Sequence, residues 1–260
     1  MLALSDRAIA PPFRLRIAVG AALLFATGCG ASPRDRPAID CAADDPYEIR
    51  VLEDYEDGSA NFVGFTDSTP GAVQYVEVAS IEDGGRCGSG RGLVLVARGN
   101  RDWGGGFGTS SSSWDGDASR YDGFSFWART PGASTKGFTL FVDDGTTLAA
   151  GGVCVPSTGM AGTSTVSIDI NGMITVSGPV PAANACGNSF FAVLFASERW
   201  QFHRIPFAAL AQAPWPNRSA SGIDRSSILA RAIRMPKESE VELWIDDFGL
   251  YREKALHVGE

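Results

Sequence analysis

Short runs of β-branched and aromatic residues recur along the sequence from about residue 47, and glycine-rich or polar turns separate them. Residues 121–129 alternate in character, with Phe124 and Phe126 on one face, and residues 138–143 alternate in the same way. Helical periodicity is nearly absent, and the chain carries 31 glycines. The pattern predicts an all-β fold, a jelly-roll or related β-sandwich of about ten strands.

The runs place the expected strands along the chain. Strands are expected at residues 49–55, 73–79, 92–98, 121–129, 138–143, 190–195, 200–206, 228–235 and 241–251, with a short helical turn at 207–212. Residues 190–195 are continuously apolar, which predicts a strand buried on both faces.

A separate element is expected between Cys154 and Cys186. Residues 165–170 and 173–176 alternate, and Asn171-Gly172 lies between them. An Asn-Gly pair between two alternating runs is a strong signal for a β-hairpin. We therefore expect a hairpin insertion stapled at its base by a disulfide.

The first part of the sequence indicates export. Arg7, Arg14 and Arg16 precede the apolar run 17–28, which is too short to span a bilayer and ends at Cys29. The segment resembles a bacterial lipoprotein signal, in which the cysteine is lipidated, although Ala26 stands where leucine is usual. The alternative is an ordinary secretory signal cleaved nearby. The lipoprotein interpretation predicts a protein anchored by its lipid to the bacterial cell envelope, at the outer membrane.

The cysteines agree with an oxidising compartment. The chain has five cysteines, and lipidation of Cys29 would leave Cys41, Cys87, Cys154 and Cys186 for two disulfides. Three pairings are open; we favour Cys41–Cys87 with Cys154–Cys186, which keeps each bridge within one half of the chain. A zinc site is disfavoured, because the sequence has no CxxC pair and two histidines.

Length and charge limit the organisation and the partners. We expect a signal peptide at 1–28, a flexible tether at 29–46, one domain at 47–252 and a C-terminal tail at 253–260. The net charge of −8 argues against nucleic acid as a partner and against a basic membrane-binding patch.

Several phrases, in this order, resemble one group of proteins. They are Leu52–Gly58, Trp103–Gly108, Tyr121–Arg129, Gly151–Cys154, Trp200–Trp215 and Leu243–Phe248. Together they resemble the jelly-roll carbohydrate-binding modules of the galactose-binding-like superfamily, in particular myxobacterial-type lipoproteins built on that domain. The resemblance covers about residues 47–252 and implies the fold more strongly than the function, because this scaffold hosts several functions. The segment between Cys154 and Cys186 is longer than its usual counterpart.

The resemblance also implies a structural calcium ion. In jelly-roll modules of this kind the first and last strands are neighbours, and a calcium ion commonly joins them through carboxylates and backbone carbonyls. Here Glu56, Asp246 and Asp247 occupy the matching positions, and residues 88–93 resemble the carbonyl-donating segment. The alternative is that these carboxylates cap turns and keep strand ends soluble. Residues 115–119 space oxygens like a calcium loop but lack its glutamate, so a turn is expected there.

Aromatic residues provide the signal for sugar binding. Trp103, Trp114 and Trp215 fall in or beside polar segments, where an indole could stack on a sugar ring. Trp127 and Trp244 lie inside predicted strands and are assigned to the core. If the first three do not bind, the concave strand faces are the next place to look.

Catalytic patterns are missing from the sequence. There is no Gly-x-Ser-x-Gly elbow, the serine tract 110–113 has no histidine partner, and His203 is expected to be structural. We therefore predict a non-catalytic, carbohydrate-binding surface lipoprotein whose partner is a polysaccharide or glycan. The alternative is a structural or protein-interaction lipoprotein on the same fold without a sugar site.

Replacing Cys29 with serine tests the anchor, because serine cannot accept the lipid. The wild type should sediment with the membrane fraction, and the Cys29→Ser variant should move to the soluble fraction. Equal fractionation of the two proteins would show that Cys29 carries no anchor.

Overall fold

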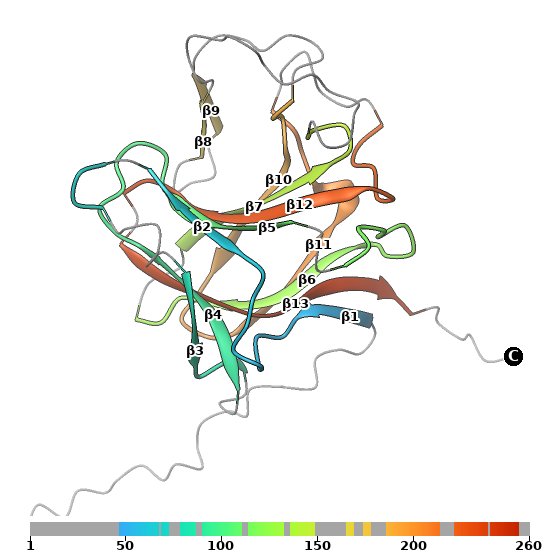
Figure 1. Ribbon diagram of the computed structural model, residues 1–260, viewed down its shortest axis with the longest axis horizontal. Coiled ribbons are helices and arrows are strands. Elements are labelled where there is room, and N and C mark those ends of the chain that lie inside the picture. The colour runs from blue at the N-terminus through green and yellow to red at the C-terminus, as the bar shows by residue number, and fades with distance from the viewer. Residues whose placement is uncertain are drawn as a thin grey trace, which may run out of the picture. The chain divides into compact units, whose positions relative to one another are not determined.

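Two antiparallel sheets pack face to face and enclose the core of the domain (Figure 1). The structure is a computed structural model that describes residues 47–67, 69–72, 79–86, 90–110, 114–132, 136–148, 165–168, 174–177, 186–213, 221–238 and 240–254. The chain divides into two units, Met1–Pro37 and Ala38–Glu260, and every described residue belongs to the second. The second unit is a jelly-roll β-sandwich, as the sequence predicted.

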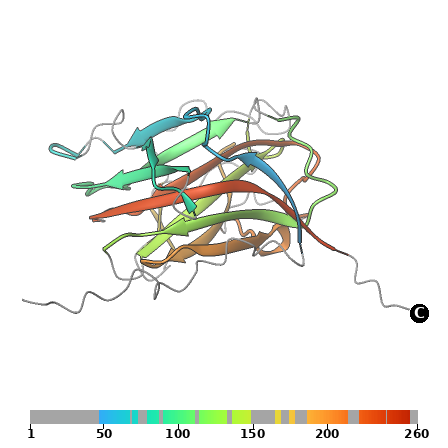
Figure 2. The ribbon, with the colours of Figure 1, turned by 90° about the horizontal axis from the view of Figure 1, so that it is seen from below.

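The first sheet is six-stranded and is organised around its longest strand, β13 (Val241–Glu253). Its order is β11 (Gln201–Pro206), β6 (Gly123–Arg129), β13, β4 (Arg91–Ala97) and β3 (Ala79–Asp83), and β1 (Tyr47–Glu53) also pairs with β13. Figure 2 shows the red β13 between the green β6 and the strands of the N-terminal half. The first half of β13 pairs with β4 and its second half with β1, so the first and last strands of the domain are neighbours, as expected.

The second sheet is five-stranded and contains two strands that the sequence patterns did not predict. Its order is β10 (Phe190–Ala196), β7 (Lys136–Asp144), β12 (Ile228–Met235), β5 (Gly105–Ser110) and β2 (Val63–Thr66). Strand β5 reads Gly-Gly-Phe-Gly-Thr-Ser, and glycine has low β-propensity. Strand β5 is held in the sheet by its ladders with β12 and β2 on either side, because its own residues have little tendency to form a strand.

Alternation along the strands fills the space between the sheets. Phe124 and Phe126 of β6 point inward, as the sequence predicted, and both are fully buried. They face side chains of β7 and β12, including Phe138, Leu140 and Ile233. The next residue along each strand therefore lies on an outer face of the sandwich.

The prediction that residues 190–195 form a strand was right, but the prediction that both faces of this strand are buried was wrong. Residues 190–195 form β10, but β10 lies at the edge of its sheet and is not buried on both faces. Val193 and Leu194 are half-buried, and Phe195 is exposed. Continuous apolar sequence therefore does not distinguish an apolar edge strand from a central one.

Trp127 and Trp244 are buried, but they lie outside the main core. With Trp200 and Val94 they form a second cluster, distinct from the cluster between the sheets. Their strand neighbours Phe126 and Leu243 belong to the main core, so the tryptophans lie on the outer face of the six-stranded sheet. The guanidinium of Arg129 lies 4.8 Å from the Trp200 ring centre and 4.7 Å from that of Trp244. The assignment of these two tryptophans to the sandwich core is therefore corrected.

The predicted hairpin is present. Strands β8 (Thr165–Ile168) and β9 (Ile174–Ser177) pair in an antiparallel ladder. They stand beyond the five-stranded sheet, on the side away from the six-stranded sheet (Figure 1). Cys186 is disulfide-bonded, whereas Cys29, Cys41, Cys87 and Cys154 lie outside the described residues, so both pairings stay predictions.

Two smaller expectations have a clear outcome. The helical turn predicted at 207–212 is a 3-10 helix at Phe207–Ala209. Residues 115–119 form a turn, in which the Asp117 and Ser119 amides donate to the carboxylates of Asp115 and Asp117. No helix in the described part of the chain is long and apolar enough to cross a membrane.

His203 of β11 packs among aromatic rings, as expected for a structural histidine. Its ring stacks on Phe126 at 5.4 Å between centroids and meets the edge of Phe138 at 5.9 Å. Its Nε2 atom is buried without a hydrogen-bond partner among the described residues. Burial lowers the pKa of His203 to about 4.

This depressed pKa makes the stability of the domain depend on pH. The unfolded chain binds the proton at a pKa of about 6.5, so the contribution of neutral His203 is complete above pH 6.5. It is lost as the pH falls towards 4, by on the order of 2–3 kcal/mol. Urea unfolding of wild type and His203→Phe between pH 7 and 4 should show a shallower loss in the variant. A His257→Ala control should keep the wild-type profile, and identical profiles for wild type and His203→Phe would contradict the assignment.

Candidate functional site

The outer face of the five-stranded sheet carries a strip of small residues between aromatic side chains. Gly106 and Gly108 of β5 alternate with the core residue Phe107, and Ala232 of β12 alternates with Ile233. Gly108 lies opposite Ala232 in the ladder. We call Gly106, Gly108 and Ala232 the small-residue strip.

Packing of the backbone requires part of this strip. A Cβ atom on Gly106 would lie 2.0 Å from the Ile233 carbonyl oxygen. At Gly108 a Cβ would lie 3.4 Å from that of Ala232 and 3.7 Å from the Phe65 ring, which is ordinary contact. The first glycine is therefore needed for the ladder, and neither glycine adds a side chain to the outer face; Gly106 is itself buried, opposite Arg234 of β12.

Phe141 of β7 borders the strip on one side. It lies opposite Ala232 in the ladder and is half-buried. Its other neighbour across the sheet is Phe191 of β10, whose ring lies 6.1 Å away and is buried. The strip therefore has an aromatic border on the β7 side.

Arg234 adds a cation beside that border. It follows Ala232 on the same face of β12, and its guanidinium lies 4.6 Å from the centre of the Phe141 ring. Burial lowers the pKa of Arg234 to about 10, so the group stays charged at neutral pH. A guanidinium carries five N–H donors, and stacking on the ring holds this group at the aromatic border.

Phe65 and Trp103 border the strip on the β2 side. Phe65 of β2 lies opposite Gly106, and the centroid of the Trp103 ring is 5.9 Å from that of Phe65. Both side chains are half-buried. Three strand spacings separate β2 from β7, so the two aromatic borders are roughly 14 Å apart. We call the strip with Phe65, Trp103, Phe141 and Arg234 the outer-face site.

An acidic residue lies at one end of this site. Asp143, two residues after Phe141 on the same face of β7, accepts a hydrogen bond from Thr147. Burial raises the pKa of Asp143. Its carboxyl group places a hydrogen-bond acceptor near the aromatic border, as a hydroxylated ligand requires.

The three tryptophans predicted to bind ligand do not form one surface in the described residues. Trp103 precedes β5, whereas Trp114 follows it, so they leave opposite ends of one strand. Trp114 is half-buried and packs against the main core. Trp215 lies outside the described residues. Of the three, Trp103 is the one that the structure places at the outer-face site.

A second feature joins the first and last strands near Glu56 and Asp246. Asp246 of β13 is buried, and it accepts hydrogen bonds from the Arg86 and Asp247 amides at 2.6 and 2.8 Å. Burial is the main cause that raises the pKa of Asp246 to about 7, and neighbouring Asp247 and Glu56 add to it. The Gly85 amide donates to the Gly90 carbonyl at 2.9 Å, and these two glycines lie against Asp246 and Glu56, so the structure brings carboxylates from both ends of the domain to one region.

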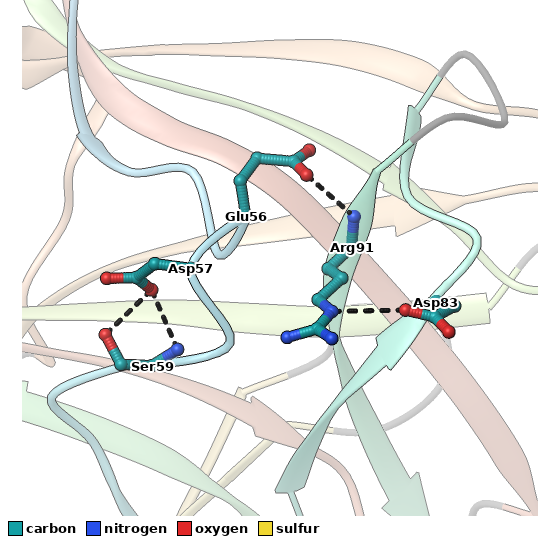
Figure 3. A network of polar contacts seen from close by, with 5 residues as sticks. All are labelled: Glu56, Asp57, Ser59, Asp83 and Arg91. Carbon is teal, nitrogen blue, oxygen red and sulfur yellow. Dashed lines mark hydrogen bonds and ion pairs between the residues drawn. The ribbon is translucent and has the colours of Figure 1, made fainter.

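Glycines let backbone approach both carboxylates. A Cβ on Gly90 would lie 1.8 Å from Glu56 Oε1, and one on Gly85 would lie 2.8 Å from Asp246 Oδ2. Figure 3 shows Glu56 accepting the Arg91 amide, while the Arg91 side chain turns to Asp83. We call Glu56, Asp246 and the backbone of Gly85 and Gly90 the carboxylate cradle.

Asp247 points to a different partner. It has a φ of 48° at the bulge of β13, and its Oδ2 lies 2.6 Å from the Arg86 guanidinium. Arg86 also lies 4.7 Å from the centre of the Trp127 ring. Within the described residues, no group of three or more His, Cys, Asp or Glu side chains is arranged to hold a metal ion. A cation in the cradle would therefore need backbone carbonyls beside the two carboxylates, which suits calcium.

Comparison with known proteins supports the fold. No protein-family model and no curated protein sequence matches this chain. The family 11 carbohydrate-binding module of the cellulosomal cellulase Lic26A-Cel5E of Clostridium thermocellum is 18% identical, with 82% of this chain and 98% of that chain covered and a TM-score of 0.52. The solution structure of CtCBM11 is 16% identical, with 80% and 96% covered and a TM-score of 0.51. A family 11 module from Clostridium thermocellum in complex with a β-1,3-1,4-mixed-linked tetrasaccharide is 18% identical, with 78% and 94% covered and a TM-score of 0.49. The chain therefore shares the jelly-roll fold of carbohydrate-binding modules.

Sequence reasoning missed Phe65, Phe141 and Arg234 as site residues. The available signal was alternation: Phe141 falls between the core residues Leu140 and Val142, so an aromatic ring had to lie on the outer face. Its position beside the small-residue strip depends on the order of strands in the sheet, which the local pattern does not contain.

Proposed function

We propose that this domain binds a glycan chain without cleaving it, at the outer-face site. The observation that carries the proposal is the small-residue strip between Phe65–Trp103 and Phe141–Arg234. A sugar ring can lie on glycine and alanine and contact aromatic carbon with its C–H face, while Arg234 and Asp143 supply a donor and an acceptor for hydroxyl groups. The shared fold with carbohydrate-binding modules agrees with this function.

We further propose that the protein is an exported lipoprotein that presents this domain at the cell envelope. The run ending at Cys29 supports the proposal. A lipid anchor and a glycan-binding domain in one chain would hold a polysaccharide at the bacterial surface. If no glycan binds, the same fold would serve as a structural or protein-interaction lipoprotein.

Substitutions at the outer-face site test sugar binding. Trp103→Ala and Phe141→Ala should each weaken binding to a polysaccharide by about 5- to 150-fold, since removing an aromatic contact costs about 1–3 kcal/mol. Ala232→Gln should weaken binding by filling the strip. Isothermal titration with a glycan chosen from an array gives the dissociation constants.

A matched control uses the opposite sheet. Phe202 of β11 is half-buried and packs against Trp127, 5.2 Å away, so Phe202→Ala removes an aromatic ring elsewhere and should keep wild-type affinity. Trp114→Ala and Trp215→Ala test the other two tryptophans that the sequence predicted to bind ligand. If wild type binds no glycan on the array, the proposed function fails. If Trp103→Ala and Phe141→Ala bind like wild type, the site assignment fails.

We also propose that the carboxylate cradle holds a structural calcium ion through Glu56 and Asp246. The support is chemical: the closely packed backbone of Gly85 and Gly90 lies against the Asp246 and Glu56 carboxylates, and burial raises the pKa of Asp246. The ion would stabilise the negative charge and join the segment after β1 to β13. Because Asp247 pairs with Arg86, the ligand set does not include its side chain.

Chelation should lower the unfolding midpoint of the calcium-loaded protein. A ligand at 100 times its dissociation constant adds about 2.7 kcal/mol, which corresponds to a shift of roughly 5–10 °C for a domain of this size. Differential scanning calorimetry with EDTA and then excess calcium measures the response. Glu56→Gln and Asp246→Asn should reduce it, whereas Asp83→Asn, which breaks the neighbouring ion pair with Arg91, should leave it intact. A wild-type midpoint that ignores EDTA and calcium would exclude the ion.

A further inference from the structure

The loop that carries Trp103 is tied to one buried carboxylate. Asp67, just after β2, accepts hydrogen bonds at its Oδ2 atom from three consecutive backbone amides, those of Asp102, Trp103 and Gly104, at 3.1, 3.1 and 3.0 Å. The Asp67 amide donates in return to the Gly104 carbonyl at 2.9 Å. Three adjacent N–H groups directed at one oxygen fix the path of the chain on both sides of Trp103.

The second oxygen of Asp67 is also occupied. Its Oδ1 atom accepts the Thr69 amide at 3.2 Å and the Asn100 side-chain amide at 3.2 Å. The Thr69 hydroxyl in turn accepts the Arg101 amide at 3.1 Å. The loop between β4 and β5 is therefore held from its beginning to its end by residues near Asp67.

The carboxylate stays charged although it is buried, with 3% of Asp67 exposed. Burial by itself would raise the pKa of Asp67, but hydrogen bonds from Gly104, Thr69 and Asp102 outweigh it and hold the pKa well below its usual range. Hydrogen bonds to an ionised acceptor are stronger than those between neutral groups. The charge thus strengthens the contacts that order the loop.

We propose that Asp67 is a positioning residue that holds Trp103 against Phe65 as a preformed stacking surface for glycan; this inference rests on the proposed function. Asp67 and Phe65 belong to the same short segment of chain, so the residue that anchors the tryptophan loop also follows the strand that carries its aromatic partner. A surface ordered before binding loses less entropy when the sugar arrives. Without the charge of Asp67, Trp103 would sample other positions.

The test compares Asp67→Asn with wild type in two measurements. Asparagine keeps the size but loses the charge, and its NH2 group would face backbone donors, so affinity for glycan should fall at least fivefold. Fluorine NMR of 5-fluorotryptophan-labelled protein reports the position of each indole, and the line absent from Trp103→Phe identifies Trp103. That line should shift or broaden in Asp67→Asn, while the other described tryptophans keep their lines.

Asp117→Asn is the matched control. Asp117 accepts the Ser119 amide at 2.9 Å in an exposed turn away from Trp103, so its loss should change neither the affinity nor the Trp103 line. If Asp67→Asn does not fold, Thr69→Val replaces it, because this change removes a hydroxyl that accepts the Arg101 amide and hydrogen-bonds the Asp67 carboxylate, while the Asp67 charge is kept. The same shift of the Trp103 line is then expected, with an affinity loss of about twofold or more.

The outcomes separate this inference from the proposed function. If wild type binds glycan and Trp103→Ala weakens binding, but Asp67→Asn keeps wild-type affinity or an unchanged Trp103 line, Asp67 is not a positioning residue and the glycan site stands. If wild type binds no glycan, the proposed function fails, and the Trp103 line alone decides whether Asp67 positions the indole. An unchanged line in that case overturns the inference.

Discussion

The bulge in β13 is the constraint on which the six-stranded sheet depends. β13 pairs with β4 in its first half and with β1 in its second half, and its register against β6 shifts between Asp246 and Gly249. Asp247 takes a left-handed conformation at this point, with a φ of 48°. The bulge re-aims two adjacent carboxylates, so that Asp246 is buried against the Arg86 amide and Asp247 meets the Arg86 guanidinium. The change of strand partner and the carboxylate cradle therefore have one structural origin.

In the five-stranded sheet, glycines of β5 and just before it determine how closely β5 packs on β12. Gly106 is required because a Cβ would strike the Ile233 carbonyl, and Gly104 is required because a Cβ would lie 2.1 Å from the Met235 carbonyl. The close approach of β5 to β12 therefore leaves β5 without outward side chains at Gly106 and Gly108. Close backbone packing and a strip without large side chains follow from the same glycines. This dual role explains how a strand of low β-propensity can lie inside a sheet.

The sequence predicted the β-sandwich because alternation is a local property of each strand. It located β12 at its observed limits, and it placed Phe124 and Phe126 on the core face of β6. It did not predict β5, whose order comes from its neighbours, nor the edge position of β10. Trp103 was found because a tryptophan in a polar loop is visible in the sequence. The role of Arg234, in contrast, depends on its contact with Phe141 on another strand. Contacts between distant strands are the information that local patterns lack.

Tryptophan content alone was a poor guide to the binding face, because a ring can stack on sugar only if its face is accessible. On the six-stranded sheet Arg129 lies over both Trp200 and Trp244, and Arg86 lies over Trp127. These cations cover the indoles and complete a buried layer, in which Trp127, Trp200 and Trp244 are each less than a tenth exposed. Trp103 differs, since it stays half-buried beside Phe65 and next to glycine. The tryptophans of the two sheets thus differ: the six-stranded sheet covers Trp127, Trp200 and Trp244 with arginine as part of the fold, whereas Trp103, beside the five-stranded sheet, stays half-buried against Phe65.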